Sequence, residues 1–183
     1  MNMLNPVIIL LAAFLAIYFQ SSFDLFRNLF GAQVDLLPAL MVYTSLTLGI
    51  TSVALLALLG GLLFDSLSAN PLGITVLPLF AIGFVIHRFH GLLLRENLSA
   101  QFAFGAGASL LAPVLTLLIL LSADRHPLVG WGTIWQLLVL SLMGGLLTPV
   151  CFWILDRIAG ALNYQPIAQS SFRSDRQIKR GRG

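Results

Sequence analysis

Asp65 is the residue of this chain whose type and position most directly suggest chemistry, because it stands at the end of a long apolar run. A carboxylate at the centre of a bilayer helix costs roughly 2.5 to 3.5 kcal/mol, so we expect it to have a compensating partner. A single aspartate could carry a proton or an ion, but the other apolar segments offer few ionisable residues for a relay. Acid–base catalysis needs a second convergent group as well. A structural or partner-binding role is therefore the expectation for Asp65.

His87 and His90 are the next candidates, since residues three apart on a helix share one face. Apart from Glu96, no cysteine or acidic residue lies near them in sequence, so we expect no metal site. The chain lacks the zinc-type His-Glu-x-x-His, Walker and Gly-x-Ser-x-Gly motifs. Cys151 is the only cysteine, which excludes an intramolecular disulfide. We expect neither an enzyme nor a cofactor, and no nucleic-acid partner.

The composition indicates an integral membrane protein. Of the 183 residues, 58% are hydrophobic and 9% are charged, and the mean hydropathy is +0.93. Soluble domains carry about 25% charged residues. No remaining stretch of the chain could bury a separate water-soluble core. The first apolar segment lacks the basic start and cleavage site of a secretory signal, so we expect it to be a retained helix.

The apolar segments predict an all-α, polytopic protein with about six membrane helices. The uncharged stretch from Leu36 to Phe64 is too long for one membrane-spanning helix, and its polar centre contains Gly49. We therefore expect two short helices there, with a single helix and one span fewer as the alternative. The expected helices cover residues 6–23, 35–48, 50–66, 72–87, 100–121 and 133–155, all within a membrane domain of residues 1–162.

The basic residues predict the orientation. If both ends are inside, most cations, Arg157 and the tail included, face the cytoplasm, whereas Arg27 and Arg125 lie outside. One span fewer would bring Arg27 inside as well. The positive-inside rule therefore places the carboxyl terminus in the cytoplasm and leaves the side of the amino terminus open. The tail, residues 163–183, is polar and expected to be disordered. Its cations could bind an anionic membrane surface, at roughly 1 kcal/mol each, or an acidic protein. They are Arg173, Arg176, Lys179, Arg180 and Arg182.

Asp65 is expected to act on the turn that follows its helix. The dipole at the end of a helix favours positive charge, so its own helix does not stabilise Asp65. The next helix, after Asn70 and Pro71, offers unpaired amides that a carboxylate can accept. We expect Asp65 to close this hairpin by capping the following helix, or to form part of a partner-binding rim. Elsewhere, small residues recur at the spacing that lets helices pack closely in lipid. They include Gly105 with Ser109 and Gly144 with Gly145.

At Asp65 and the residues around it, the chain resembles the MreD family of rod shape-determining membrane proteins. The resemblance extends over nearly all of the membrane region and is strongest in the segment around Asp65. The signature residues, with a structural or partner-binding role, are Gly60, Gly61, Asp65, Asn70, Pro71 and Gly73. Supporting features are the Asp35-Leu36-Leu37-Pro38 entry, Val42-Tyr43, Gly83, Pro149 and the basic carboxyl end.

The resemblance implies a fold similar to the substrate-binding membrane subunits of energy-coupling-factor vitamin transporters. It implies a non-enzymatic scaffold in the bacterial cytoplasmic (inner) membrane that binds MreC. Through MreC, the scaffold would couple MreB filaments to RodA and a class B penicillin-binding transpeptidase, and so to lateral peptidoglycan synthesis. The alternative that stays open is a small-molecule-binding membrane subunit of a transporter.

Overall fold

The structure, a computed structural model, describes residues 4–22, 35–68, 71–89, 97–123 and 130–162. Within these residues the protein is all-helical, with six helices and no strands. The helices are α1 (Leu4–Ser22), α3 (Leu37–Thr47), α4 (Ile50–Leu67), α5 (Val76–Phe89), α6 (Leu98–Ser122) and α7 (Trp131–Leu162). The expected tail over 163–183 lies outside the described residues, as do His90, Glu96, Arg27 and Arg125.

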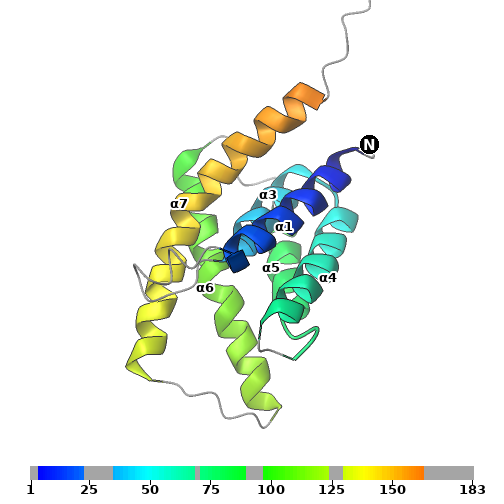
Figure 1. Ribbon diagram of the computed structural model, residues 1–183. Coiled ribbons are helices and arrows are strands. Elements are labelled where there is room, and N and C mark those ends of the chain that lie inside the picture. Colours follow the sequence, from blue (N-terminus) through cyan, green and yellow to red (C-terminus); the bar gives the residue numbers. More distant parts are fainter. Residues whose placement is uncertain (1–3, 23–34, 69–70, 90–96, 124–129, 163–183) are drawn as a thin grey trace, which may run out of the picture.

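Successive helices run in alternate directions, so the described chain begins and ends on the same side of the bundle (Figure 1). On that side, residues from the start of α1, the end of α3 and the end of α7 line one cavity. We call it the Asp156 end of the bundle. The opposite side, where α4 ends and α5 begins, is called the Asp65 end.

Three of the described helices are long and apolar enough to cross a membrane: Ile50–Leu67, Leu98–Ser122 and Trp131–Ala161. The other three are shorter apolar helices, Val7–Gln20, Leu37–Thr47 and Val76–Phe89. Large apolar side chains project outward on every helix except α3, as with Phe14 on α1 and Leu138 on α7. Lipid can cover such surfaces at no cost, which is consistent with a membrane protein.

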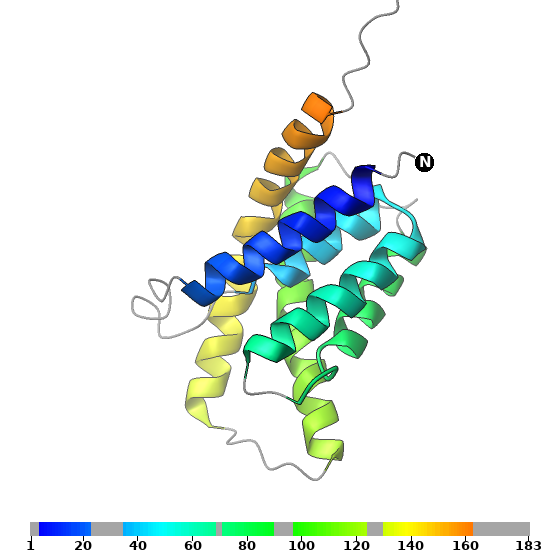
Figure 2. The same cartoon turned by 45° about the vertical axis from the view of Figure 1, so that its right-hand side comes forward.

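Helix α3 lies at the centre of the bundle, where it packs against all five of the other helices (Figure 2). Every residue from Leu37 to Ser45 is buried, including the aliphatic hydroxyl residues Thr44 and Ser45. The Thr44 hydroxyl donates to the Leu40 carbonyl at 2.8 Å, and the Ser45 hydroxyl to the Met41 carbonyl at 2.6 Å. These bonds within the helix satisfy the hydroxyl donors without help from another helix.

The polar centre of the long uncharged stretch separates two helices. Helix α3 ends at Thr47 and α4 begins at Ile50. Between them, Leu48 and Gly49 have extended backbones, and the Gly49 carbonyl accepts the Ser52 amide at 3.0 Å. The Thr47 hydroxyl donates back to the Tyr43 carbonyl at 2.7 Å, so this hydroxyl is satisfied within its own helix.

Two helices differ from the sequence-based bounds by more than two residues at one end. Helix α5 begins at Val76, although the sequence predicted a start at residue 72, because the backbone still turns at Gly73, whose φ is +88°. Helix α7 covers Trp131–Leu162 and is longer at both ends than the expected 133–155. It continues through Pro149, which stands inside the helix.

Helices α6 and α7 form the most extensive helix pair, with small residues where their backbones approach. A Cβ atom added at Gly105 would clash with the Thr148 side chain, and one added at Gly144 would clash with Ser109. The Ser141 hydroxyl donates to the Ala106 carbonyl across the pair at 3.2 Å. The spacing from Gly105 to Ser109 therefore serves packing within the chain.

Candidate functional site: the α4–α5 hairpin

The Asp65 carboxylate is buried in the hairpin between α4 and α5, with 1% of its surface exposed. Its Oδ2 atom accepts the Gly73 amide at 2.9 Å and the Thr75 amide at 3.1 Å. Its Oδ1 atom accepts the Thr75 hydroxyl. Hydrogen bonds to charged groups are stronger than those between neutral groups, and they offset the cost of burying a carboxylate. Asp65 thus has the hydrogen-bond partners that its position demands.

The turn that supplies these donors depends on Gly73. Its φ of +88° lies in the left-handed region, which residues with a side chain rarely adopt. The preceding Pro71 carbonyl accepts the Ile74 amide at 3.3 Å, which tightens the turn. As a result the Gly73 and Thr75 amides point at the same carboxylate oxygen. Thr75 lies directly before α5, so Asp65 fixes the point at which that helix begins.

Gly60 and Gly61 allow close packing beside this turn. A Cβ atom on Gly61 would lie 2.8 Å from Cγ2 of Val76 and 3.0 Å from its backbone, closer than real Cβ contacts come. A Cβ atom on Gly60 would lie 3.1 Å from Leu37 Cδ2. Gly61 therefore brings the end of α4 against the start of α5, and Gly60 brings α4 against α3.

The signature residues are thus partly brought together. Gly61, Asp65 and Gly73 meet in one hairpin, and Pro71 is exposed on its turn. Asn70 lies outside the described residues. The expected contact between Asp65 and amides ahead of the next helix is present, with Gly73 and Thr75 as the donors. This arrangement makes Asp65 a structural acceptor that holds two helices together.

Sequence reasoning missed Thr75. Its hydroxyl and its amide both donate to Asp65, and it is itself buried. The available signal was local, because a threonine directly before an apolar helical segment is a common N-cap residue.

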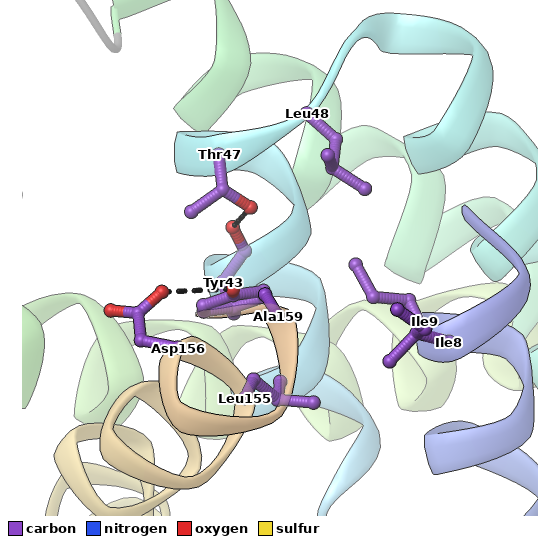
Figure 3. A pocket seen from close by; sticks show the side chains of 8 residues that line it. All are labelled: Ile8, Ile9, Tyr43, Thr47, Leu48, Leu155, Asp156 and Ala159. Atoms are coloured by element: carbon purple, nitrogen blue, oxygen red, sulfur yellow. Dashed lines mark hydrogen bonds between the residues drawn. The ribbon is translucent and has the colours of Figure 1, made fainter. Parts of the chain in front are cut away.

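Sequence reasoning also missed a second polar group, the pair of Tyr43 and Asp156 at the Asp156 end. The Tyr43 hydroxyl donates to Asp156 Oδ1 at 3.0 Å, across 113 positions of sequence. The Tyr43 ring meets the Phe152 ring edge to face, with centroids 4.9 Å apart. Beside this pair, a cavity of about 220 Å³ opens between α1, α3 and α7 (Figure 3). A carboxylate six residues before the end of the last helix was the only sequence signal for this site.

His87 serves a contact between helices. Its Nδ1 atom lies 3.0 Å from the Ser45 carbonyl, which joins the end of α5 to α3. Among the described residues, no group of three or more histidine, cysteine or acidic side chains could hold a metal ion.

Over the residues that the structure describes, the fold and this hairpin define the class as an all-helical protein with three helices long and apolar enough to cross a membrane. Comparison of the chain with protein-family models, with curated proteins and with solved structures found no match.

Proposed function

We propose that this chain is a non-enzymatic membrane scaffold of the bacterial cell-wall elongation machinery, similar in role to MreD. The observation that carries the proposal is the hairpin itself. The residues on which the resemblance is strongest, among them Gly61, Asp65 and Gly73, meet in one helix–helix junction. A junction of this kind sets how the outer faces of α4 and α5 are presented to a partner. The fold similarity to energy-coupling-factor substrate-binding subunits is part of this proposal.

In the proposed arrangement the six helices each cross the inner membrane, and the Asp156 end faces the cytoplasm. The bitopic protein MreC is the direct partner. Its membrane helix would pack against exposed apolar surface of this chain, where fit between side chains and small residues replaces the hydrophobic effect. MreB filaments, RodA and the class B penicillin-binding transpeptidase would join through that complex, and rod shape would depend on it.

The test is a pull-down of the tagged chain from native membranes, with identification of the bound chains. We expect MreC to co-purify, and depletion of the chain to abolish rod shape or viability. Asp65→Ala should reduce the recovery of MreC, because it loosens the α4–α5 hairpin. Gly107→Ala is the matched control, since a Cβ atom there meets nothing within 4 Å. Recovery of no elongation protein together with normal shape on depletion would contradict the proposal.

A small-molecule-binding membrane subunit of a transporter is the second candidate function. The cavity beside Tyr43 and Asp156 supports it, because a binding pocket needs a few convergent polar groups in an apolar lining. This candidate predicts a thermal shift with a member of a vitamin panel and co-purification of an ATPase. The scaffold predicts neither.

A further inference from the structure

Helix α6 contains a proline, Pro113, in its second half. Proline has no amide hydrogen, so the carbonyl four residues earlier, that of Ser109, loses its helical donor. Ser109 is 2% exposed, and among the residues that the structure describes its hydroxyl has no hydrogen-bond partner either. Helices bend where a backbone hydrogen bond is missing in this way. The weak point of α6 therefore lies between Ser109 and Pro113.

Helix α7 has a weak point at the same level. Pro149 stands inside α7 and takes the helical donor from the Gly145 carbonyl. The residue beside it, Gly144, packs so closely on Ser109 that an added Cβ atom would clash with the Ser109 side chain. Figure 1 and Figure 2 both show α6 and α7 diverging from this region toward the Asp65 end. Both helices thus lack a backbone hydrogen bond where they approach each other, and a bend at this level costs less than one elsewhere.

Packing does not hold the last part of α6 in place. All the buried residues of α6 lie before Pro113. They are Gln101, Gly105, Ala108, Ser109 and Ala112. From Pro113 to Ser122 no residue is buried, and Leu118 and Leu121 are 56% and 50% exposed. Lipid tails are as apolar as these side chains and can replace their contacts at little cost. Segments with so few buried contacts are the ones that move most easily.

The same part of α6 has room to move. A groove of about 270 Å³ lies between it and the start of α5, where Leu77, Pro78 and Ala81 form one wall. Every residue of the α6 wall follows Pro113. These residues are Leu115, Leu118, Ile119 and Ser122. The stretch from residue 114 to 122 is about 14 Å long, so a bend of about 20° at the proline moves its end by about 5 Å. Such a bend would carry the α6 wall toward the α5 wall and narrow the groove.

We propose that residues 114–122 of α6 form a hinged segment, which closes on the start of α5 and opens again about Pro113. The structure holds the open position. In the closed position the segment covers Ala81, which lipid reaches when the segment is open. Because Asp65 fixes the start of α5, the hinge changes how much of a fixed α5 surface is open to the membrane. The hinge is independent of the proposed scaffold function.

The test measures distances between spin labels in lipid nanodiscs by pulsed electron paramagnetic resonance, after Cys151→Ala has removed the sole cysteine. One label, at Leu58→Cys, stands on α4, which packs on α5. The second stands on α6, either after the hinge at Leu121→Cys or before it at Leu111→Cys. The native side chains at residues 58, 121 and 111 are 48%, 50% and 49% exposed, so the three positions are matched.

We expect two distances, about 5 Å apart, for the label pair 58 and 121, because the second label moves with the hinged segment. The pair 58 and 111 should give a single distance, since both of its labels lie outside that segment. A single distance for the pair 58 and 121, as narrow as that of the control pair, would overturn the proposal.

Two variants separate the hinge from the groove. Pro113→Ala returns an amide donor to the Ser109 carbonyl, so one distance should replace the two. Ala81→Leu fills the groove, so only the longer distance should remain. Ala103→Leu is the matched control, because Ala103 is exposed on α6 before the hinge, and it should keep both distances.

The label pair 58 and 111 reports whether each variant keeps its fold. Two unchanged distances in a folded Pro113→Ala variant, or in a folded Ala81→Leu variant, would overturn the proposal. If a variant loses the distance of the control pair, it has not folded, and the two label pairs in the parent protein decide alone.

Discussion

At the scale of single residues, the buried carboxylate of Asp65 is held by donors that lie 8 and 10 positions further along the chain. A buried donor or acceptor without its partner costs about 1 to 3 kcal/mol, and more when it is charged. The cost of burying Asp65 is therefore offset only while Gly73 keeps its turn and Thr75 keeps its place before α5. The same three residues position the hairpin and stabilise it.

Asp65→Ala should lower the free energy of unfolding in mixed detergent micelles by about 3 kcal/mol, because it leaves the half-buried Gly73 amide and the buried Thr75 amide without their acceptor. Thr75→Val removes the hydroxyl bond alone and should cost about 1 kcal/mol. A retained melting transition together with full function in Asp65→Ala would show that the carboxylate does not hold the hairpin.

Asp35 is a second carboxylate at the Asp65 end, two residues before the start of α3. It accepts the Leu37 amide at 2.9 Å, and the neighbouring Leu36 amide donates to Gln20 on α1 at 3.2 Å. Burial raises the pKa of Asp35 from 3.8 to about 6, against the lowering effect of its bonds to Leu37 and Gln20. The folded protein therefore binds this proton more tightly than the unfolded chain does.

Because the pKa of Asp35 is higher in the folded protein than in the unfolded chain, protonation of Asp35 favours the folded state. The resulting contribution to the free energy of unfolding is fully present below pH 3.8 and is lost as the pH rises to about 6. The free energy of unfolding of the wild type should accordingly fall over that interval relative to Asp35→Asn. Denaturant titrations of both proteins at a series of pH values measure the difference and cancel the titration of other carboxylates. If the difference in free energy of unfolding between the wild type and Asp35→Asn does not change with pH, the pKa of Asp35 is not raised.

At the scale of the elements, the close approach of α6 and α7 depends on small residues on both helices. Ser109 is 2% exposed, and its hydroxyl has no hydrogen-bond partner within the described part of the chain. Its side chain fills the space over Gly144. Packing in lipid gains from such approach, since the lipid tails are as apolar as leucine side chains and no hydrophobic effect drives helices together.

Gly144→Ala should lower the free energy of unfolding by about 2 kcal/mol, because its Cβ atom would clash with Ser109 and force the helices apart. Adding Ser109→Gly should restore part of that loss, since it removes the side chain that the new methyl group meets. Gly107→Ala is again the control and should be neutral or slightly stabilising. Unfolding in detergent measures all three, and equal stability of the Gly144→Ala variant and the wild type would contradict the packing.

The helices themselves were largely predictable from sequence, because apolar runs and polar interruptions are local signals. The polar centre at Gly49 predicted the break between α3 and α4. The start of α5 was displaced by four residues, since the sequence marks Gly73 as a turn residue without giving its φ. The pairing of α6 with α7 was not predicted, because a spacing of small residues names no partner helix.

At the scale of the whole molecule, the helices alternate in direction and bring both ends of the described chain to the Asp156 end. If that end faces the cytoplasm, the tail cations meet an anionic leaflet. Each cation contributes roughly 1 kcal/mol to such an attraction. They would then bias orientation without contacting MreC.

Replacement of Arg173, Arg176, Lys179, Arg180 and Arg182 by glutamine should accordingly leave the proposed complex with MreC intact and weaken binding of the tail to anionic vesicles. Co-purification measures the first effect, and vesicle sedimentation of the tail peptide measures the second. If the complex with MreC is lost instead, the tail is a protein contact.

The sequence by itself determined the all-helical class with strongly apolar helices, most helix positions and the contact of Asp65 with amides ahead of the next helix, because these follow from composition, run length and turn residues. Tertiary structure alone decided that α3 is enclosed on all sides and that Tyr43 meets Asp156. The physical reason is that membrane helices are apolar toward lipid and toward one another, so their sequences carry little periodicity to mark the inner face. The partner of each face is settled by shape and by a few buried polar groups, which meet only after the chain has folded.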